Sequence, residues 1–366
     1  MPARRFKILD ATIELRGPAA SVEPIACAYR RFALVDPVLV GAGTAAVPDD
    51  SPSVNGRQIL PIEGYDPALQ LYGEFLLETR RLITSTALIH GASLVDSSGG
   101  ATLIAAPSSF GKTSLALGLL ARGHRLLSDD YSPLDLSTGC VHPFPRAVAV
   151  DPGGSAPLPA AFRDAAARPN APRLLGKALL DIGEVLGEGA LQREPTPLRR
   201  VVLLTGDTAF SLDCDTQVEL RVGALAEHSR RFERALEGIS GVAVVDRGER
   251  GAMRFWTLVL DTSRRPSEPL SRLFDDPAVV FVERWGESTP TFEGSPESRP
   301  IPRSEAALLL AREMLNRREG GGALAAYGGR LAPLLLDLAG ALRDAGCFSV
   351  KPGRDLDRTA AMTENL

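Results

Sequence analysis

Residues 101–131 read ATLIAAPSSFGKTSLALGLLARGHRLLSDDY, and the order of elements in this stretch decides the fold. A short apolar run at 103–105 has the length and flanks of a buried strand. The loop 106–113 follows, and after it apolar residues recur at helical spacing until Gly123, which can end a helix. A second short strand is predicted over 125–128. The stretch therefore predicts a strand, a loop, a helix and a second strand.

Two carboxylates, Asp129 and Asp130, come directly after the second strand. A polyphosphate needs backbone N–H groups pointed at it and a positive helix end behind it, and a loop that runs straight into a helix supplies both. Strand, loop, helix, strand and acid in this order are typical of a nucleoside-triphosphate site. On an extended chain two successive side chains point to opposite faces, which predicts different roles for the two aspartates.

The loop itself carries the chemistry of a phosphate site. Gly111 lets the backbone approach a phosphate closely, Lys112 brings a mobile cation, and the Thr113 hydroxyl can bind Mg²⁺. The strict G-x-x-x-x-G-K-[ST] pattern is broken at its first position, where Ala106 replaces glycine. The predicted ligands are ATP and Mg²⁺, and the predicted nucleotide-binding residues are Ala106, Pro107, Ser108, Ser109, Phe110, Gly111, Lys112, Thr113 and Ser114.

Composition narrows the class of protein. The 366 residues suffice for two domains, or for one large domain with an appendage. With 41 basic and 45 acidic residues the formal net charge is -4, which argues against nucleic-acid binding. No apolar leader or membrane span is recognised, so a cytoplasmic protein that does not bind membranes is expected. The scattered cysteines form no C-x-x-C pair and are read as buried free thiols: Cys27, Cys140, Cys214 and Cys347.

The chain is expected to have three parts: a β-rich N-terminal lobe ending in a helix over 1–84, an α/β core over 85–300, and a helical C-terminal extension over 301–366. A hairpin of strands at 87–95 and 102–105 leads into the phosphate loop. Further strands are predicted at 6–16, 27–35, 147–150, 200–204, 242–245, 255–260 and 278–282. Further helices are predicted at 66–84, 174–186, 225–236, 304–317 and 332–345.

The block from 89 to 130 resembles the catalytic core of HPr kinase/phosphorylase and its relatives. The matching phrases are Ile89-His90-Gly91, the loop 106–113, the phrase R-G-H-R-L at 122–126, and Asp129-Asp130. A basic loop at 350–354 is similar to one near the C-terminus of such kinases. The resemblance implies a P-loop kinase core related to phosphoenolpyruvate carboxykinase. The family signature similar to E-I-R-G-L-G is not found, so phosphorylase activity is not expected.

The resemblance also implies roles for single residues. Asp129 would be the general base, Asp130 would hold Mg²⁺ together with Thr113, and His90 would orient the catalytic aspartate. Lys112 would act on the transferred phosphate. Candidates for further phosphate or substrate contacts are Arg146, Lys177 and Arg354.

The predicted function is an ATP-dependent kinase that transfers the γ-phosphoryl group to a hydroxyl. By resemblance, the acceptor is a serine of a small protein or peptide. Two alternatives stay open at this point: a kinase of small-molecule hydroxyls, and a non-catalytic nucleotide-dependent binding protein. A homo-oligomer is possible.

Overall fold

The computed structural model describes residues 3–34, 52–60, 66–106, 110–151, 157–205, 217–225, 229–250, 253–261, 269–270, 273, 279–284, 294–317 and 331–366. The protein is of mixed α/β architecture. It divides into two compact units: the first comprises Met1–Leu60, Ala68–Gly206 and Phe292–Leu366, and the second comprises Pro61–Pro67 and Asp207–Thr291. This differs from the predicted three parts, because 207–291 separates from the core and 301–366 belongs to the first unit.

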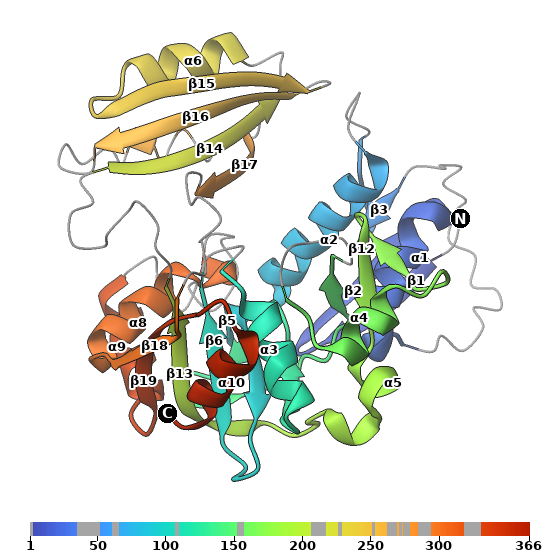
Figure 1. The fold of residues 1–366 in the computed structure, drawn as a ribbon. Coiled ribbons are helices and arrows are strands. Elements are labelled where there is room, and N and C mark those ends of the chain that lie inside the picture. Colours follow the sequence, from blue (N-terminus) through green and yellow to red (C-terminus); the bar gives the residue numbers. More distant parts are fainter. Residues whose placement is uncertain are drawn as a thin grey trace. The chain divides into compact units, whose positions relative to one another are not determined.

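The largest sheet that the structure describes lies in the first unit (Figure 1). Its strand order is β18-β19-β13-β6-β5-β8-β9, and β7 pairs with β5. The strands are β5 (Ala87–Val95), β6 (Ala101–Ala105), β7 (Arg125–Ser128), β8 (Tyr131–Leu134), β9 (Cys140–Val141), β13 (Thr196–Leu204), β18 (Glu297–Pro300) and β19 (Gly346–Lys351). The predicted hairpin is confirmed as the antiparallel pair of β5 and β6.

Strand directions bring four chain segments to one edge of this sheet. Strands β6, β13 and β19 run parallel, and β7 has the same direction because both it and β6 are antiparallel to β5. The carboxyl ends of these four strands therefore share one edge, where ligands of open α/β sheets commonly bind. The sequence did not predict β19 as a strand, and its parallel pairing with β13 is the reason why the C-terminal region is part of the core rather than an extension.

Helices cover both faces of the sheet. On one face α3 (Lys112–Ala121) and α10 (Leu356–Glu364) lie side by side (Figure 1), with Gly118 facing Leu356. On the other face lie α8 (Arg303–Arg312) and α9 (Leu331–Ala341), while the 3-10 turn η5 (Leu315–Arg317) lies alongside β5, where the Leu88 N–H donates to Asn316 Oδ1. Successive residues of a strand point to opposite faces of the sheet and so pack in different hydrophobic cores. Ile104 packs with α3, whereas Leu103 packs with α8 and α9.

The N-terminal lobe consists of a small sheet and two helices in the first unit. Its elements are β1 (Ala3–Ile8), β2 (Ala11–Arg16), β3 (Ser53–Val54), β4 (Arg57–Gln58), α1 (Ala19–Ala28), the 3-10 turn η1 (Arg30–Phe32) and α2 (Pro67–Leu82). The strand predicted at 6–16 is a hairpin that turns at Leu9, which has a φ of 53°. The strand predicted at 27–35 is wrong, because residues 27 and 28 end α1, which is buried through Val22 and Ile25, and residues 30–32 form η1.

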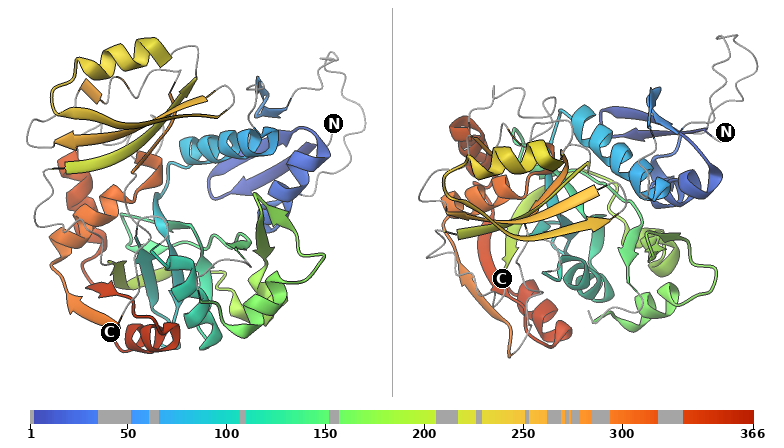
Figure 2. Two further views of the ribbon diagram at one scale, coloured as in Figure 1. Left: turned by 45° about the horizontal axis from the view of Figure 1, so that its top comes forward. Right: turned by 90° about the horizontal axis from the view of Figure 1, so that it is seen from above.

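The lobe shares its hydrophobic core with the rest of the first unit. Helix α2 lies beside the β1–β2 hairpin (Figure 2). Phe75 of α2 packs against Phe6 of this hairpin, with ring centroids 5.4 Å apart. The same core includes Tyr131 and Phe144 from outside the lobe. The lobe is therefore built into the unit and is not a separately packed attachment.

A small sheet of order β10-β12-β11 follows the predicted aspartate pair. It comprises β10 (Val148–Val150), β11 (Arg173–Leu174) and β12 (Lys177–Leu180), and the neighbouring helices are α4 (Ala160–Ala166), α5 (Ile182–Leu186) and the 3-10 turn η2 (Glu188–Ala190). The helix predicted at 174–186 is wrong over its first half. Leu175 and Gly176 both have positive φ and form a two-residue hairpin loop, so the chain turns into β12 before α5 begins.

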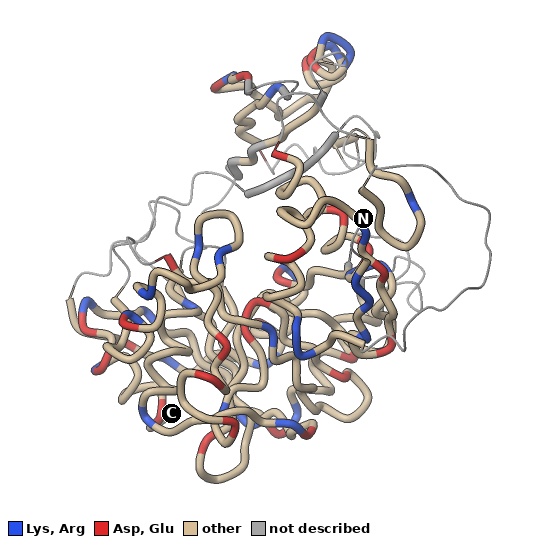
Figure 3. Tube along the Cα trace, turned by 90° about the vertical axis from the view of Figure 1, so that its right-hand side faces the viewer, with Lys and Arg blue, Asp and Glu red and all other residues tan. Residues whose placement is uncertain are grey.

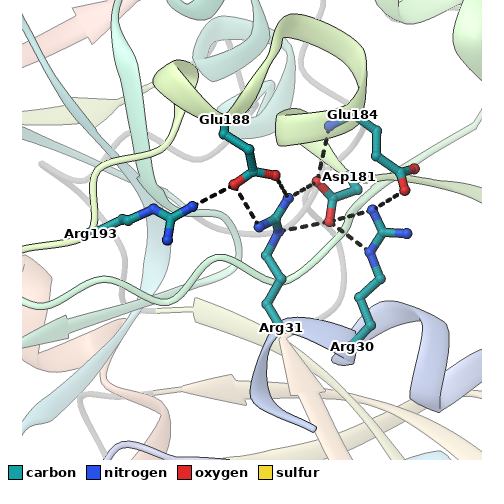
Figure 4. A network of polar contacts seen from close by, with 6 residues as sticks. All are labelled: Arg30, Arg31, Asp181, Glu184, Glu188 and Arg193. Atoms are coloured by element: carbon teal, nitrogen blue, oxygen red, sulfur yellow. Dashed lines mark hydrogen bonds and ion pairs between the residues drawn. The ribbon is translucent and has the colours of Figure 1, made fainter.

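Ion pairs connect the lobe to α5 (Figure 4). Arg31 of η1 donates to both carboxylate oxygens of Asp181, at 2.5 and 2.7 Å, and also to Glu188. Arg30 donates to Asp181 as well, at 2.8 Å. Asp181 also caps α5 by accepting from the Glu184 N–H. Elsewhere on the described trace, basic and acidic residues are interspersed (Figure 3).

The second unit is an antiparallel sheet with a helix. Its strand order is β15-β16-β14-β17, with β14 (Gln217–Leu225), β15 (Val242–Arg250), β16 (Met253–Asp261), β17 (Val279–Arg284) and α6 (Ser229–Glu237). Phe232 of α6 lies on Trp256 of β16, with ring centroids 4.7 Å apart. The helix predicted from 225 begins later, because Leu225 still belongs to β14.

Candidate active site

The predicted phosphate loop lies between β6 and α3. Gly111 is the N-cap residue of α3 and has a φ of 83°, a conformation that glycine adopts without strain. Lys112 and Thr113 are the first two helical residues, so the positive end of α3 is at Gly111. Pro107, Ser108 and Ser109, which were predicted to bind nucleotide, lie outside the described residues.

The predicted loop residues differ in what they can offer a ligand. The side chains of Ala106 and Phe110 are buried in the core beneath α3, so only their backbone groups could face a phosphate. Ser114 is buried as well. The Lys112 ammonium donates to the Ala106 carbonyl at 2.7 Å, and the lysine therefore spans the loop from its end to its start.

Asp129 and Asp130 lie in a tight turn between β7 and β8. The Tyr131 N–H donates to the Asp129 carbonyl at 2.9 Å, and Asp130 between them has a φ of 64°. A three-residue turn of this kind is rare and strained. The Gly91 N–H supports it by donating to the Asp130 carbonyl at 3.3 Å. The backbone is thus not extended here, and the prediction of simple alternation between the two side chains does not apply.

Asp129 lies beside the start of α3. Its Oδ1 accepts from the Thr113 hydroxyl at 3.1 Å, while its Oδ2 is buried and has no hydrogen-bond partner among the described residues. Only 1% of the residue is exposed. Burial, and secondarily the charge of Asp130, raise the pKa of Asp129 to about 7.

Asp130 instead faces a buried guanidinium. Its Oδ2 forms an ion pair with Arg146, and 37% of its side chain is exposed. Burial works to raise the pKa of Asp130, but Arg146 and then His90, Lys112 and Lys177 outweigh it and lower this pKa below its ordinary value. Arg146 itself is buried and its guanidinium pairs with Asp130, so the predicted phosphate contact of this side chain stays a prediction.

His90 lies on β5, and its ring Nδ1 is 3.4 Å from Oε2 of Glu313. The backbone N–H of His90 donates to the backbone carbonyl of Glu313 at 2.8 Å. The charge of His90 acts on Asp130, the residue after the one it was expected to orient. Sequence reasoning missed Glu313, because nothing local marks a glutamate at the end of α8 as a neighbour of β5.

The two remaining candidates lie further out. Lys177 is exposed at the start of β12, and its charge reaches Asp130. Arg354 is exposed and follows β19, at the same end of the sheet as the predicted phosphate loop. Its backbone N–H donates to the Gly294 carbonyl. In the part of the chain that the structure describes, no hydrogen bond or ion pair joins the Arg354 side chain to the aspartates.

The donor set suits a magnesium ion bound together with a phosphate. Mg²⁺ is usually held by one or two carboxylates plus waters and substrate phosphates. The Thr113 hydroxyl and the unpartnered Asp129 Oδ2 are such oxygen donors. Among the described residues, no three His, Cys, Asp or Glu side chains cluster as a metal-binding group, and no helix has the length and apolar character needed to cross a membrane.

Comparisons with known proteins found no matching family and no matching curated protein. Among solved structures, the chain is similar to the HPr(Ser) kinase/phosphatase from Coxiella burnetii, with 19% sequence identity over 34% of this chain and 70% of that chain. The TM-score of this similarity is 0.24. A similarity of this size carries no weight for the fold or the activity, and the geometry above has to support any function.

Proposed function

We propose that the protein is an ATP-dependent kinase that transfers the γ-phosphoryl group to a hydroxyl. Its core would be a P-loop core of the phosphoenolpyruvate carboxykinase type, and the acceptor would be a serine of a small protein or peptide. One observation carries the proposal: the Thr113 hydroxyl, at the N-terminus of a helix that starts with Lys112, contacts the buried Asp129, and Asp130 lies next to it. Helix end, cation, hydroxyl and two carboxylates are the parts that phosphoryl transfer requires.

The helix end and Lys112 would bind the phosphates. The backbone N–H groups at the start of α3 have no partner within the helix and can donate to phosphate oxygens. Lys112 would exchange its bond to the Ala106 carbonyl for one to a phosphate, which places its charge where negative charge develops during transfer. Mg²⁺, held by Thr113 and Asp129, would neutralise charge on the phosphate oxygens.

The contacts favour an exchange of the two predicted aspartate roles. Thr113 contacts Asp129 and not Asp130, so Asp129 is the better partner for the metal. Asp130 is the more exposed of the two and lies near His90, so it is the better partner for an acceptor hydroxyl. The acceptor oxygen forms a bond to the γ-phosphorus while the bond to the β–γ bridging oxygen breaks, Asp130 takes the hydroxyl proton, and ADP leaves.

The test is transfer from γ-labelled ATP in the presence of Mg²⁺. Purified protein is incubated separately with a serine-containing peptide library and with a metabolite extract, and Lys112→Ala serves as the control. Label on peptides that depends on Lys112 supports the proposal. Label only on small molecules overturns the acceptor class, and MgATP binding without any transfer or hydrolysis points to the non-catalytic binding protein.

A further inference from the structure

Arg146 is a buried cation that bridges the N-terminal lobe and the aspartate turn. Only 5% of the residue is exposed. One guanidinium nitrogen, Nη2, pairs with Asp130, while the other, Nη1, donates to the Tyr72 hydroxyl at 3.1 Å and lies 3.4 Å from the Tyr29 hydroxyl. The two terminal nitrogens of the guanidinium thus contact different partners, a carboxylate of the site and two tyrosine hydroxyls of the lobe.

Aromatic rings surround this guanidinium. Its central carbon lies 5.9 Å from the ring centroid of Tyr29 and 5.7 Å from that of Tyr131. The Tyr29 ring in turn packs edge-on against Phe75, with centroids 4.8 Å apart. Guanidinium groups stack favourably on such faces when water is excluded. The backbone is fixed as well, because the Ala147 N–H donates to the Ala28 carbonyl of α1 at 2.8 Å.

We propose that Arg146, held by Tyr72 and Tyr29, is a positioning residue that fixes the Asp130 carboxylate for the acceptor hydroxyl. The N-terminal lobe is then part of the catalytic apparatus, because Tyr29, which follows α1, and Tyr72 of α2 supply the groups that hold the arginine. The inference rests on the proposed kinase function and adds a role for residues that the sequence motif does not include.

The physical reason is pre-organisation. Asp130 has a strained positive φ, and its carboxylate needs a fixed partner to keep one orientation. Transfer rates fall about a hundredfold for a misplacement on the order of 1 Å. A planar guanidinium can hold a carboxylate and a hydroxyl at once with fixed geometry, whereas a lysine ammonium at the same position keeps the charge and loses the fork.

The experiment compares Tyr72→Phe, Arg146→Lys and the unmodified protein, with MgATP as substrate and water as acceptor, so that no acceptor needs to be known. We expect kcat to fall about tenfold in Tyr72→Phe and about a hundredfold in Arg146→Lys. The Kd for MgATP, measured by calorimetry, should stay within about twofold, because no hydrogen bond or ion pair joins either side chain to the described residues of the loop. A loss in kcat without a loss in affinity is not what general destabilisation produces.

Arg31→Lys is the matched control. Arg31 is also a lobe arginine whose guanidinium holds an aspartate of the core, but that aspartate is Asp181 and not Asp130 (Figure 4). Arg31→Lys should lower the melting temperature and leave kcat unchanged. A second control combines Tyr72→Phe with Asp130→Asn: if Tyr72 acts through Asp130, the tyrosine substitution has no further effect in this background.

The outcomes separate the two proposals. An unmodified protein that neither binds nor hydrolyses MgATP contradicts the kinase function. An active protein whose Tyr72→Phe and Arg146→Lys variants keep the parental kcat contradicts the positioning role alone. The positioning role is equally overturned if Tyr72→Phe lowers kcat by the same factor with and without Asp130→Asn.

Discussion

At the scale of single residues, two neighbouring carboxylates have opposite environments. Asp129 is buried against Thr113 with one oxygen unpartnered, whereas Asp130 is partly exposed and paired with Arg146. The pKa of the first is raised and that of the second is lowered. Carboxylates whose environments differ in this way commonly have different roles in one site.

Lys112→Ala should remove most of the affinity for MgATP. A hydrogen bond to a charged group contributes roughly 1.5–3 kcal/mol, which corresponds to about ten- to a hundredfold in Kd. Calorimetry on the folded variant measures this. An unchanged Kd would contradict the assignment of the phosphate loop.

Asp129→Asn and Asp130→Asn should differ in kind. We expect the first to weaken the Mg²⁺-dependent part of ATP binding, because an amide is a poorer metal ligand than a carboxylate. The second should keep MgATP affinity within a few-fold and lose on the order of 10²–10⁴ in turnover, because an amide cannot take the acceptor proton. The opposite pair of phenotypes would return the two residues to the roles that the family resemblance implied.

The raised pKa of Asp129 predicts how stability depends on pH in metal-free protein. Between its ordinary value of 3.8 and about 7, the folded state holds a proton that the unfolded state has released. The contribution of the Asp129 carboxyl to the free energy of unfolding therefore falls as pH rises from 3.8 to about 7, and it does not fall further above about pH 7. Melting temperatures from pH 5 to 8 should show this fall, and Asp129→Asn should lessen it. An identical pH dependence in both proteins would contradict the burial of an ionisable Asp129.

At the scale of elements, the β5–β6 hairpin leads the chain into the phosphate loop. Its close packing depends on Gly91, where an added Cβ would lie 2.5 Å from the Ile104 carbonyl oxygen. Gly73 in the middle of α2 is the opposite case, since a Cβ there would meet no heavy atom within 4 Å. The same chemical change therefore has opposite consequences in the two elements.

Gly91→Ala should destabilise the protein by about 1–3 kcal/mol, because backbone atoms of β6 have to shift. Gly73→Ala should stabilise it by roughly 0.5–1 kcal/mol, because alanine is the better helix former. Denaturant titration of both variants measures the two free energies of unfolding. A Gly91→Ala protein that is as stable as the parent, or more stable, would show that the hairpin tolerates a side chain at position 91.

At the scale of the whole molecule, local sequence predicted the elements around the phosphate loop and missed those that join distant segments. Strands β5, β6 and β7 and helix α3 follow from apolar runs, a glycine loop and turn residues within 87–128. Strand β19 depends on its pairing with β13, and the contacts of Arg146 with Tyr72 and Tyr29 join three separate segments. No local pattern carries such information, so the partners of the two aspartates became visible only in the folded chain.

The larger part of the second unit, Asp207–Thr291, is inserted between segments that are already close in the first. The Thr205 N–H donates to the Val350 carbonyl, and the Gly294 carbonyl accepts from the Arg354 N–H, so the chain leaves and re-enters beside β19. Replacing 207–291 by a short Gly/Ser linker should leave the first unit folded with MgATP affinity unchanged. Circular dichroism and calorimetry of the shortened chain measure both, and an unfolded product would contradict the independence of the two units.

The packing of α10 on α3 also has a consequence for the time course of synthesis. The side chains of Leu356 and Ala360 cover α3 at Gly118, and Glu364 pairs with Arg122. Roughly 235 residues separate the end of α3 from the start of α10, so a ribosome needs roughly 12–50 s to add them. During that interval this surface of α3 is uncovered on the nascent chain. The helix that carries Lys112 therefore acquires its native surroundings only after residues 356–364 have emerged, however early its own residues were made.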